Sequence, residues 1–151
     1  MSLPPADDPH GLRRFLDAQR GCHDGVLAEL RAGRKRTHWM WFIFPQVEGL
    51  GHSSTARHYA IRSLDEARAY LAHPVLGERL RECAAIVAGI PECSAREIFG
   101  SPDDLKLRSS MTLFEHVAGG GTVFSRVLER FYRGERDART LGIVAEMEKR
   151  P

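Results

Sequence analysis

The chain has 151 residues and a mass of 17.0 kDa, a length that supports one well-formed core rather than two full domains. Hydrophobic residues make up 42% of the chain and charged residues 28%, which excludes wholesale disorder. The formal net charge is only +2, too small an excess to identify a nucleic-acid-binding protein from composition.

The sequence contains no apolar run near the roughly 20 residues that a membrane span requires. The N-terminal residues combine neither a basic region nor an apolar one, so they do not match a signal peptide. Cys22, Cys83 and Cys93 are widely spaced, unlike a disulfide framework or a zinc clip. These features predict a reduced, cytoplasmic protein that does not enter the membrane.

The chain opens with a segment that differs in composition from the rest. Residues 1–9 hold three prolines and two aspartates, and predict a disordered tail. From Leu12 to Leu30, apolar residues return at intervals of three and four, which predicts a helix. Gly21 and Gly25 can kink or divide this helix, since glycine costs about 1 kcal/mol relative to alanine in a helix interior.

Residues 37–62 interrupt the helical pattern. Residues 37–44 are dense in aromatic and β-favouring side chains and are followed by proline, which predicts a short buried strand or extended segment. In an extended segment, Trp39 and Trp41 would face the same side. Residues 55–61 fit either a second strand or a short helix.

Five helix-start signals appear after residue 62. Two are capping boxes, in which serine is followed three residues later by glutamate. A third combines serine, proline and two aspartates, and the others are a lone threonine and a lone aspartate. The signals begin at Ser63, Ser94, Ser101, Thr122 and Asp137.

These patterns together predict a mainly α protein. We expect a compact single-domain helical bundle over residues 10–148, with a short extended or β segment around residues 37–62.

Residues 38–46 carry the most concentrated chemical signal, because both tryptophans of the chain lie within them. A flat base or a sugar can stack on aromatic faces, and a buried indole needs a partner for its N–H group. Gln46 follows the proline that ends the stretch and can read an amide or base edge. The alternatives are a segment buried on both sides and an ordinary loop glutamine. The candidate ligand-binding residues are His38, Trp39, Trp41, Phe44 and Gln46.

Residues 49–54 form a second candidate, a turn with two glycines and two serines. Small residues of this kind let backbone N–H groups converge on an anion, although the spacing is not that of a P-loop. An ordinary turn is the alternative. Ser53, Ser54 and the nearby Tyr59 are the candidate ligand-binding residues here.

Residues 100–110 form a third candidate at a predicted helix start. A helix N-terminus can bind an anion, although aspartates there repel phosphate and favour simple capping. In a functional site, Asp104 or Asp103 would orient a ribose hydroxyl or stabilise developing positive charge, and Lys106 would contact phosphate or form a Schiff base. Ser109 is a further ligand-binding candidate, because a hydroxyl on an otherwise apolar helix needs a partner; the backbone carbonyl four residues earlier is the alternative partner.

The histidines give no metal-binding spacing, so we expect no metal and no cofactor. The basic cluster at residues 31–36 is typical of a solvated helix end, and phosphate or nucleic-acid binding is the alternative interpretation.

Five stretches of the chain resemble a bacterial family of unknown function, number eighteen-ten, whose members often bear the label calpastatin. The resemblance covers roughly residues 10–145, and nothing in the chain resembles a calpain-inhibitor repeat. The matching stretches are residues 14–19, 35–46, 49–53, 70–80 and 98–114.

More distantly, the family is similar to the NADAR proteins, which are associated with ADP-ribose chemistry, including removal of ADP-ribose from modified nucleic-acid bases. The NADAR motif usually carries a glutamate after its serine, whereas residues 53–59 of this chain contain no carboxylate. The resemblance implies a protein that binds ADP-ribose or a related nucleotide, or an N-glycosidase-like hydrolase acting on such compounds. The alternative is a non-catalytic protein- or nucleotide-binding module.

Under the first hypothesis, aromatic side chains stack on the base and the turn at residues 49–54 cradles phosphate, while Asp104 and Lys106 serve the ribose as catalytic residues. Cleavage of a glycosidic bond passes through an oxocarbenium-like state that a carboxylate stabilises. The hypothesis requires that the aromatic stretch lie across a cleft from the helix start near residue 103.

Overall fold

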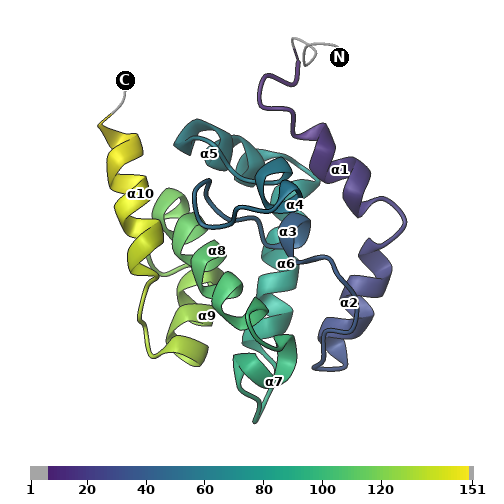
Figure 1. The fold of residues 1–151 in the computed structure, drawn as a ribbon. Helices are drawn as coiled ribbons and strands as arrows, with labels where there is room; N and C mark the ends of the chain where they lie inside the picture. Colours follow the sequence, from purple (N-terminus) through teal and green to yellow (C-terminus); the bar gives the residue numbers. More distant parts are fainter. Residues whose placement is uncertain (1–6, 150–151) are drawn as a thin grey trace.

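The computed structural model describes residues 7–149. These residues form ten helices and no strand, apart from one isolated parallel bridge between Val47 and Ile61 (Figure 1). The predicted mainly α, single-domain architecture is confirmed, while the tail predicted for residues 1–9 falls mostly outside the described residues. The helices are α1 (Arg13–Gln19), α2 (His23–Arg31), α3 (Met40–Ile43), α4 (Ser54–His58), α5 (Leu64–Ala72), α6 (Leu76–Ala88), α7 (Ala95–Phe99), α8 (Asp103–Ala118), α9 (Val123–Tyr132) and α10 (Ala138–Glu148).

The apolar repeat near the N-terminus forms two helices rather than one. Gly21 lies between α1 and α2 with φ of +81°, a left-handed conformation that glycine adopts without steric cost. Gly25 stays inside α2, so one of the two glycines divides the predicted helix and the other does not.

Side-chain caps set the start of several helices, as the sequence predicted. The Ser63 hydroxyl accepts a hydrogen bond from the backbone N–H of Glu66 at 3.0 Å, and Ser94 and Glu97 form a complete capping box. The predicted N-cap at Ser101 is displaced by one residue, because α8 begins at Asp103 with Pro102 in the N-cap position.

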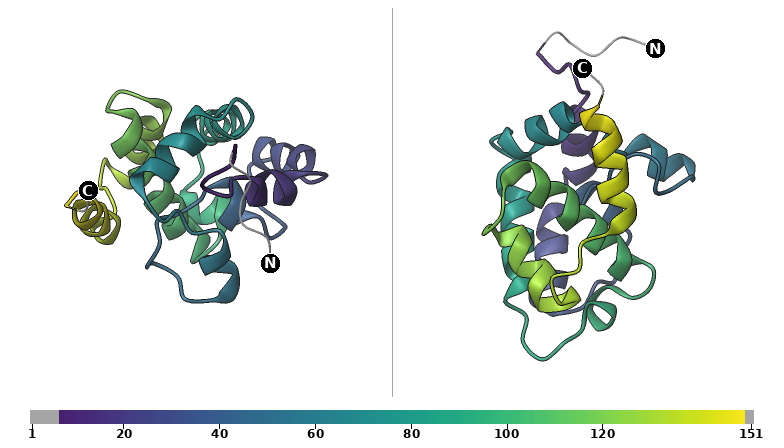
Figure 2. Two further views of the ribbon diagram at one scale, coloured as in Figure 1. Left: turned by 90° about the horizontal axis from the view of Figure 1, so that it is seen from above. Right: turned by 90° about the vertical axis from the view of Figure 1, so that its left-hand side faces the viewer.

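Helices α6 and α8 form the centre of the bundle. Helix α6 packs against α2, α5 and α9, while α8 packs against α5, α7, α9 and α10 (Figures 1 and 2). A row of aromatic rings crosses the core from α1 to α9: the ring centroids are 5.0 Å apart for Phe15–Tyr70, 5.5 Å for Tyr70–Phe114 and 6.0 Å for Phe114–Phe124. These rings tie α1, α5, α8 and α9 into one core, since large aromatic side chains dominate core energetics.

The strand predicted for residues 37–44 is wrong, because this segment makes one helical turn, α3. The backbone N–H of Phe44 bonds to the carbonyl of Met40 at 3.1 Å, and the proline that follows cannot continue the ladder. Helical spacing buries Met40, Ile43 and Phe44 in the core and leaves Trp41 only half-buried. Trp39 and Trp41 therefore do not share a face as an extended segment would require.

The segment after α3 runs extended and is fixed to the start of α5. The backbone N–H of Ile61 donates to the carbonyl of Gln46 at 2.9 Å, and the N–H of Glu48 donates to the carbonyl of Ile61 at 2.9 Å. Between these paired positions the chain makes the turn at residues 49–53 and helix α4. Of the two alternatives that the sequence left open for residues 55–61, the short helix forms, and the second strand is reduced to one isolated bridge residue, Ile61.

No helix among residues 7–149 has the length and apolar character needed to cross a membrane.

Candidate functional site

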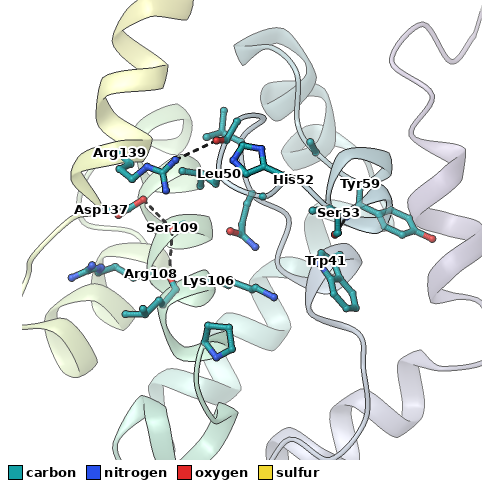
Figure 3. Close-up of a pocket in the computed structure, with 18 residues that line it drawn as sticks. Trp41, Leu50, His52, Ser53, Tyr59, Lys106, Arg108, Ser109, Asp137 and Arg139 are labelled. Atoms are coloured by element: carbon teal, nitrogen blue, oxygen red, sulfur yellow. Dashed lines mark hydrogen bonds between the residues drawn. The ribbon is translucent and has the colours of Figure 1, made fainter.

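A cavity of about 530 Å³ lies between the segment that follows α3 and the facing side of α8 and α10 (Figure 3). This volume is in the range of sites that bind small molecules. Its lining residues are Trp41, Gln46, Val47, Gly49, Leu50, Gly51, His52, Ser53, Ala56, Tyr59, Ala60, Pro102, Leu105, Lys106, Arg108, Ser109, Asp137 and Arg139.

One wall of the cavity is aromatic and meets a lysine. Trp41 and Tyr59 lie on the same side, and Lys106 extends toward Trp41 from α8 (Figure 3). The Lys106 Nζ lies 5.0 Å from the centroid of the Trp41 ring, within the range of a cation–π contact, and 3.3 Å from a carboxylate oxygen of Asp103. An aromatic face and a positive charge are thus presented side by side.

Lys35 fixes the aromatic segment to the start of α8. Its backbone N–H donates to the carbonyl of Ile98 at 2.7 Å, and its nearly buried Nζ lies 2.9 Å from Asp103 Oδ2. The same Nζ is 5.1 Å from the centroid of the Trp39 ring. The predicted juxtaposition of the aromatic stretch and the helix start near residue 103 is therefore present.

Arg14 binds the backbone on both sides of Tyr59, which is part of the aromatic wall. Its Nε donates to the carbonyl of His58 at 2.8 Å, and its Nη2 donates to the carbonyl of Ala60 at 3.0 Å. Nη2 also pairs with the buried carboxylate of Glu66 at 2.5 Å. Because these contacts bracket Tyr59 on both sides in sequence, Arg14 holds the ring in place without reaching the cavity.

The opposite end of the cavity is polar and is built by α8 and the start of α10. The Ser109 hydroxyl is shared between two acceptors, Asp137 Oδ2 at 3.0 Å and the carbonyl of Leu105 at 3.2 Å (Figure 3). Arg139 Nη2 donates to the carbonyl of Gly49 at 3.4 Å. The Arg108 Nε is buried and donates to no described residue. The Arg108 guanidinium lies 5.9 Å from the centroid of the Tyr132 ring, so its charged end is directed toward α9.

The charges that line the cavity are unbalanced. Lys106, Arg108 and Arg139 are cationic, whereas Asp137 is the carboxylate among the described residues of the lining. Positive charge concentrated in a concave, partly desolvated site favours an anionic ligand. The cavity therefore offers a flat aromatic surface at one end and cationic donors beside it and at the other end.

The turn at residues 49–53 forms the side of the cavity next to the aromatic wall. The Ser53 hydroxyl accepts a hydrogen bond from the backbone N–H of Ala56 at 3.1 Å and so caps α4, and Arg57 donates to the carbonyl of His52 at 2.6 and 2.9 Å. A Cβ on Gly51 would lie 2.7 Å from the Cβ of Ala56, so this turn is tight enough to require glycine. Ser53 thus caps α4 and is also one of the residues that line the cavity.

Six candidate residues from the sequence come together in this cavity. They are contributed by α3, the loop around α4 and α8, so three separate motifs converge as expected. The six are Trp41, Gln46, Ser53, Tyr59, Lys106 and Ser109.

The other candidates from the aromatic stretch lie outside the cavity lining. Trp39 is 2% exposed and Phe44 is fully buried, because the helical turn directs both into the core. His38 is exposed on the connection that precedes α3. None of the three is positioned to contact a ligand in the cavity.

Asp104 and Ser54 also lie outside the lining, although their sequence neighbours contribute to it. The Asp104 backbone carbonyl accepts a hydrogen bond from the Tyr132 hydroxyl, and its Oδ1 is buried without a partner among the described residues. Asp104 is one turn before Arg108 on the side of α8 that meets α9, whereas Lys106 and Ser109 face the cavity. The carboxylate that lines the cavity is Asp137 instead.

Four lining residues with polar side chains were not among the sequence candidates: His52, Arg108, Asp137 and Arg139. Asp137 carried a recognisable capping signal, but its position beside α8 depends on how α10 packs. No local spacing connects it with residues some 90 positions earlier in the chain.

Trp39 has a structural partner that explains its burial. Its indole N–H donates to Glu29 Oε1 at 3.0 Å, and the same carboxylate accepts hydrogen bonds from the Thr37 hydroxyl at 2.6 Å and from the backbone N–H groups of Arg36 and Thr37 at 2.6 and 3.0 Å. Glu29 thereby fixes the connection between α2 and α3, and with it the orientation of Trp41.

We expect Glu29 to make stability depend on pH in the acid range. Burial raises the pKa of Glu29, but the hydrogen bonds that its carboxylate accepts outweigh burial and lower the pKa from 4.5 to about 2. A lowered pKa stabilises the fold fully above pH 4.5, and this stabilisation is lost as the pH falls toward about 2. Glu29→Gln should lower the free energy of unfolding at neutral pH by about 1–2 kcal/mol. Urea unfolding across this pH range should show a flatter acid dependence for the variant; an unchanged dependence would contradict the assignment.

The basic cluster at residues 31–36 is not a uniform solvated patch. Arg31, Arg34 and Arg36 are exposed, but the Lys35 side chain is only 7% exposed and pairs with Asp103. One of the four cations is therefore committed to the fold.

Among residues 7–149, no three His, Cys, Asp or Glu side chains are grouped so that they could hold a metal ion. The three cysteines are free, and burial raises the pKa of Cys83 to about 12.

The fold and the cavity define a small all-α protein with a cavity that joins an aromatic wall to cationic side chains. Residues 9–144 match the family described as "Protein of unknown function (DUF1810)", and the chain belongs to this family. It is similar to the crystal structure of the conserved hypothetical protein Rv1873 from Mycobacterium tuberculosis, with 51% sequence identity and a TM-score of 0.90 over 91% of this chain and 99% of that chain. No curated protein matches the chain. The family expected from the sequence is thus confirmed, and the more distant NADAR similarity is not shown by these matches.

Proposed function

We propose that this protein binds a phosphorylated, nucleotide-like small molecule in the cavity between α3, the α4 loop and α8, with ADP-ribose as the first ligand to test. The contact between Lys106 and Trp41 carries the proposal, because it places a positive charge 5.0 Å from an aromatic ring that is only half-buried. A nucleotide presents the complementary pair, a flat base next to an anionic phosphate.

The arrangement of the lining residues suggests an orientation for such a ligand. A base at the Trp41 and Tyr59 end would stack on an aromatic face, an interaction worth about 1–3 kcal/mol. Phosphate would then lie against Lys106 and extend toward Arg139. Charge-assisted hydrogen bonds to phosphate are shorter and about twice as strong as neutral ones.

A concave site favours a small molecule over a protein partner. The cavity has a volume of about 530 Å³, and the exposed large hydrophobic residues of the described chain are three in number and lie on α8, on α10 and at the start of α6. These residues are Val75, Leu105 and Leu141. A protein-binding hot spot would instead present a flat, contiguous apolar surface.

Hydrolysis of a glycosidic bond is a second candidate function, and the cavity-lining carboxylate of Asp137 is the observation that favours it. Asp137 would take the stabilising role that the sequence suggested for Asp104. Glycoside hydrolases commonly use a pair of carboxylates, whereas the described lining supplies one, so we place binding first. After incubation with an ADP-ribosylated oligonucleotide, mass spectrometry should recover the conjugate intact if the protein only binds it and cleaved if the second candidate holds.

Calorimetric titration with ADP-ribose tests the proposed binding. The wild-type protein should bind saturably, and Trp41→Ala should weaken binding about tenfold, since a lost stacking contact costs about 1–3 kcal/mol. Phe131→Ala is a matched control, because this half-buried aromatic residue on α9 does not line the cavity. Absence of heat at millimolar ADP-ribose, or an equal loss of affinity in both variants, would overturn the proposal.

A further inference from the structure

We infer that Asp137 makes the cavity selective for a ligand that carries a pair of neighbouring hydroxyl groups, as ribose does, next to its phosphate. The inference rests on the proposed function and assigns the ligand's hydroxyl groups to the polar end of the same cavity. Asp137 would be a specificity-determining residue.

The Asp137 carboxylate is fixed by one of its two oxygens. Oδ2 accepts hydrogen bonds from the Ser109 hydroxyl at 3.0 Å, from the Thr140 hydroxyl at 2.6 Å and from the Thr140 backbone N–H at 3.2 Å. Oδ1 accepts no hydrogen bond from the side chains and backbone groups that the structure describes. The two Thr140 donors and the Ser109 hydroxyl, which is shared with the carbonyl of Leu105 at 3.2 Å, hold the carboxylate in one orientation. Its other oxygen is left as an acceptor for ligand hydroxyl groups.

The neighbours of Asp137 determine which part of a ligand it can accept. Phosphate is repelled by a carboxylate but is attracted by Arg139, which lines the same end of the cavity (Figure 3). Hydroxyl groups prefer the carboxylate, because they donate to it and gain little from a guanidinium that offers only donors. A ligand with both phosphate and free hydroxyls satisfies both side chains.

Asp137→Asn isolates the role of Oδ1. Asparagine is as good an N-cap as aspartate, so the start of α10 should be preserved and the unfolding midpoint should change little. The amide oxygen would keep the bonds from Ser109 and Thr140, while the amide NH₂ would replace the free acceptor by a donor. Asp65→Asn is the matched control, because Asp65 is an exposed carboxylate on α5 that does not line the cavity.

The experiment compares ribose 5-phosphate with 2-deoxyribose 5-phosphate by calorimetry, because the two probes carry the same charge and differ by one hydroxyl. The wild-type protein and Asp65→Asn should bind the ribose compound roughly tenfold more tightly, the value of one hydrogen bond to a charged acceptor. Asp137→Asn should bind both compounds with similar, weaker affinity.

Equal affinity of the wild-type protein for the two pentose phosphates would overturn this inference while leaving the proposed function intact. If neither pentose phosphate binds but ADP-ribose does, the test compares the ADP-ribose affinity of Asp137→Asn with that of the wild-type protein. A loss of affinity of roughly tenfold in the variant supports the inference, and an unchanged affinity overturns it. Failure of ADP-ribose to bind the wild-type protein would overturn the proposed function, and the inference with it.

Discussion

Replacing Lys106 with glutamate is expected to weaken ADP-ribose binding by at least about a hundredfold. The substitution removes a charge-assisted contact worth about 1.5–3 kcal/mol and places an anion where phosphate should lie, a like-charge contact that costs several kcal/mol. Lys106 also lies beside the aromatic wall, since its Nζ is 5.0 Å from the centroid of the Trp41 ring. Calorimetric titration of the variant and the wild-type protein measures the difference.

Lys149→Glu is the control for this charge reversal. Lys149 follows α10, is exposed and pairs with Glu146 rather than facing the cavity. It changes the net charge equally, so the comparison separates the local position of the charge from its overall effect. Asp103 keeps its partner Lys35 at 2.9 Å in the Lys106 variant, so the start of α8 should stay folded. Equal affinity of the two variants for ADP-ribose would exclude Lys106 from the binding site.

The largest expected effect on stability belongs to Gly77→Ala, which should lower the free energy of unfolding by at least about 3 kcal/mol. A Cβ at residue 77 would lie 2.0 Å from the backbone carbonyl oxygen of Leu71 and 2.8 Å from its carbonyl carbon. Both atoms belong to the backbone of α5, so no side-chain movement relieves the overlap. Helices α5 and α6 would have to separate, and urea unfolding should show a clear fall in the midpoint.

Gly25→Ala should change stability in the opposite direction. Gly25 also lies within a helix, but no neighbouring atom comes within 4 Å of the position its Cβ would take. The gain in helix propensity should raise the free energy of unfolding by about 1 kcal/mol. If both variants are destabilised to the same extent, the close approach of α5 and α6 is not the reason that residue 77 is glycine.

Local chemistry in the sequence was sufficient to place most of the helices. The capping boxes at Ser63 and Ser94 and the N-cap at Asp137 predicted three helix starts that the structure confirms. Such signals are reliable because a cap satisfies backbone N–H groups within three residues of itself and needs no distant partner.

The error at residues 37–44 has a tertiary cause. Aromatic and β-branched side chains favour an extended backbone only weakly, and packing overrides that preference. Here Met40, Ile43 and Phe44 reach the core together only if the backbone turns, since these positions share one face of a helix. Nothing within the eight residues reveals that the core requires this spacing.

The same turn explains why the sequence did not distinguish the two tryptophans. Trp39 and Trp41 were equally good candidates for stacking, but Trp39 is buried against Glu29 while Trp41 lines the cavity. The partner of Trp39 lies ten residues earlier on α2, so its role depends on helix packing. Asp137 lines the cavity instead of the expected Asp104 for a similar reason. Only the packing of α10 against α8 decides which carboxylate lines the cavity.

The indole N–H resonances of the two tryptophans offer the most direct test of the binding site. Each gives one signal in a nitrogen–proton correlation spectrum, and Trp39→Phe identifies which signal belongs to Trp41. Addition of ADP-ribose should shift the Trp41 signal saturably and leave the Trp39 signal, held by its hydrogen bond to Glu29, nearly unmoved. If the Trp41 signal stays in place at millimolar ADP-ribose, or if only the Trp39 signal moves, the cavity is not a site for this ligand.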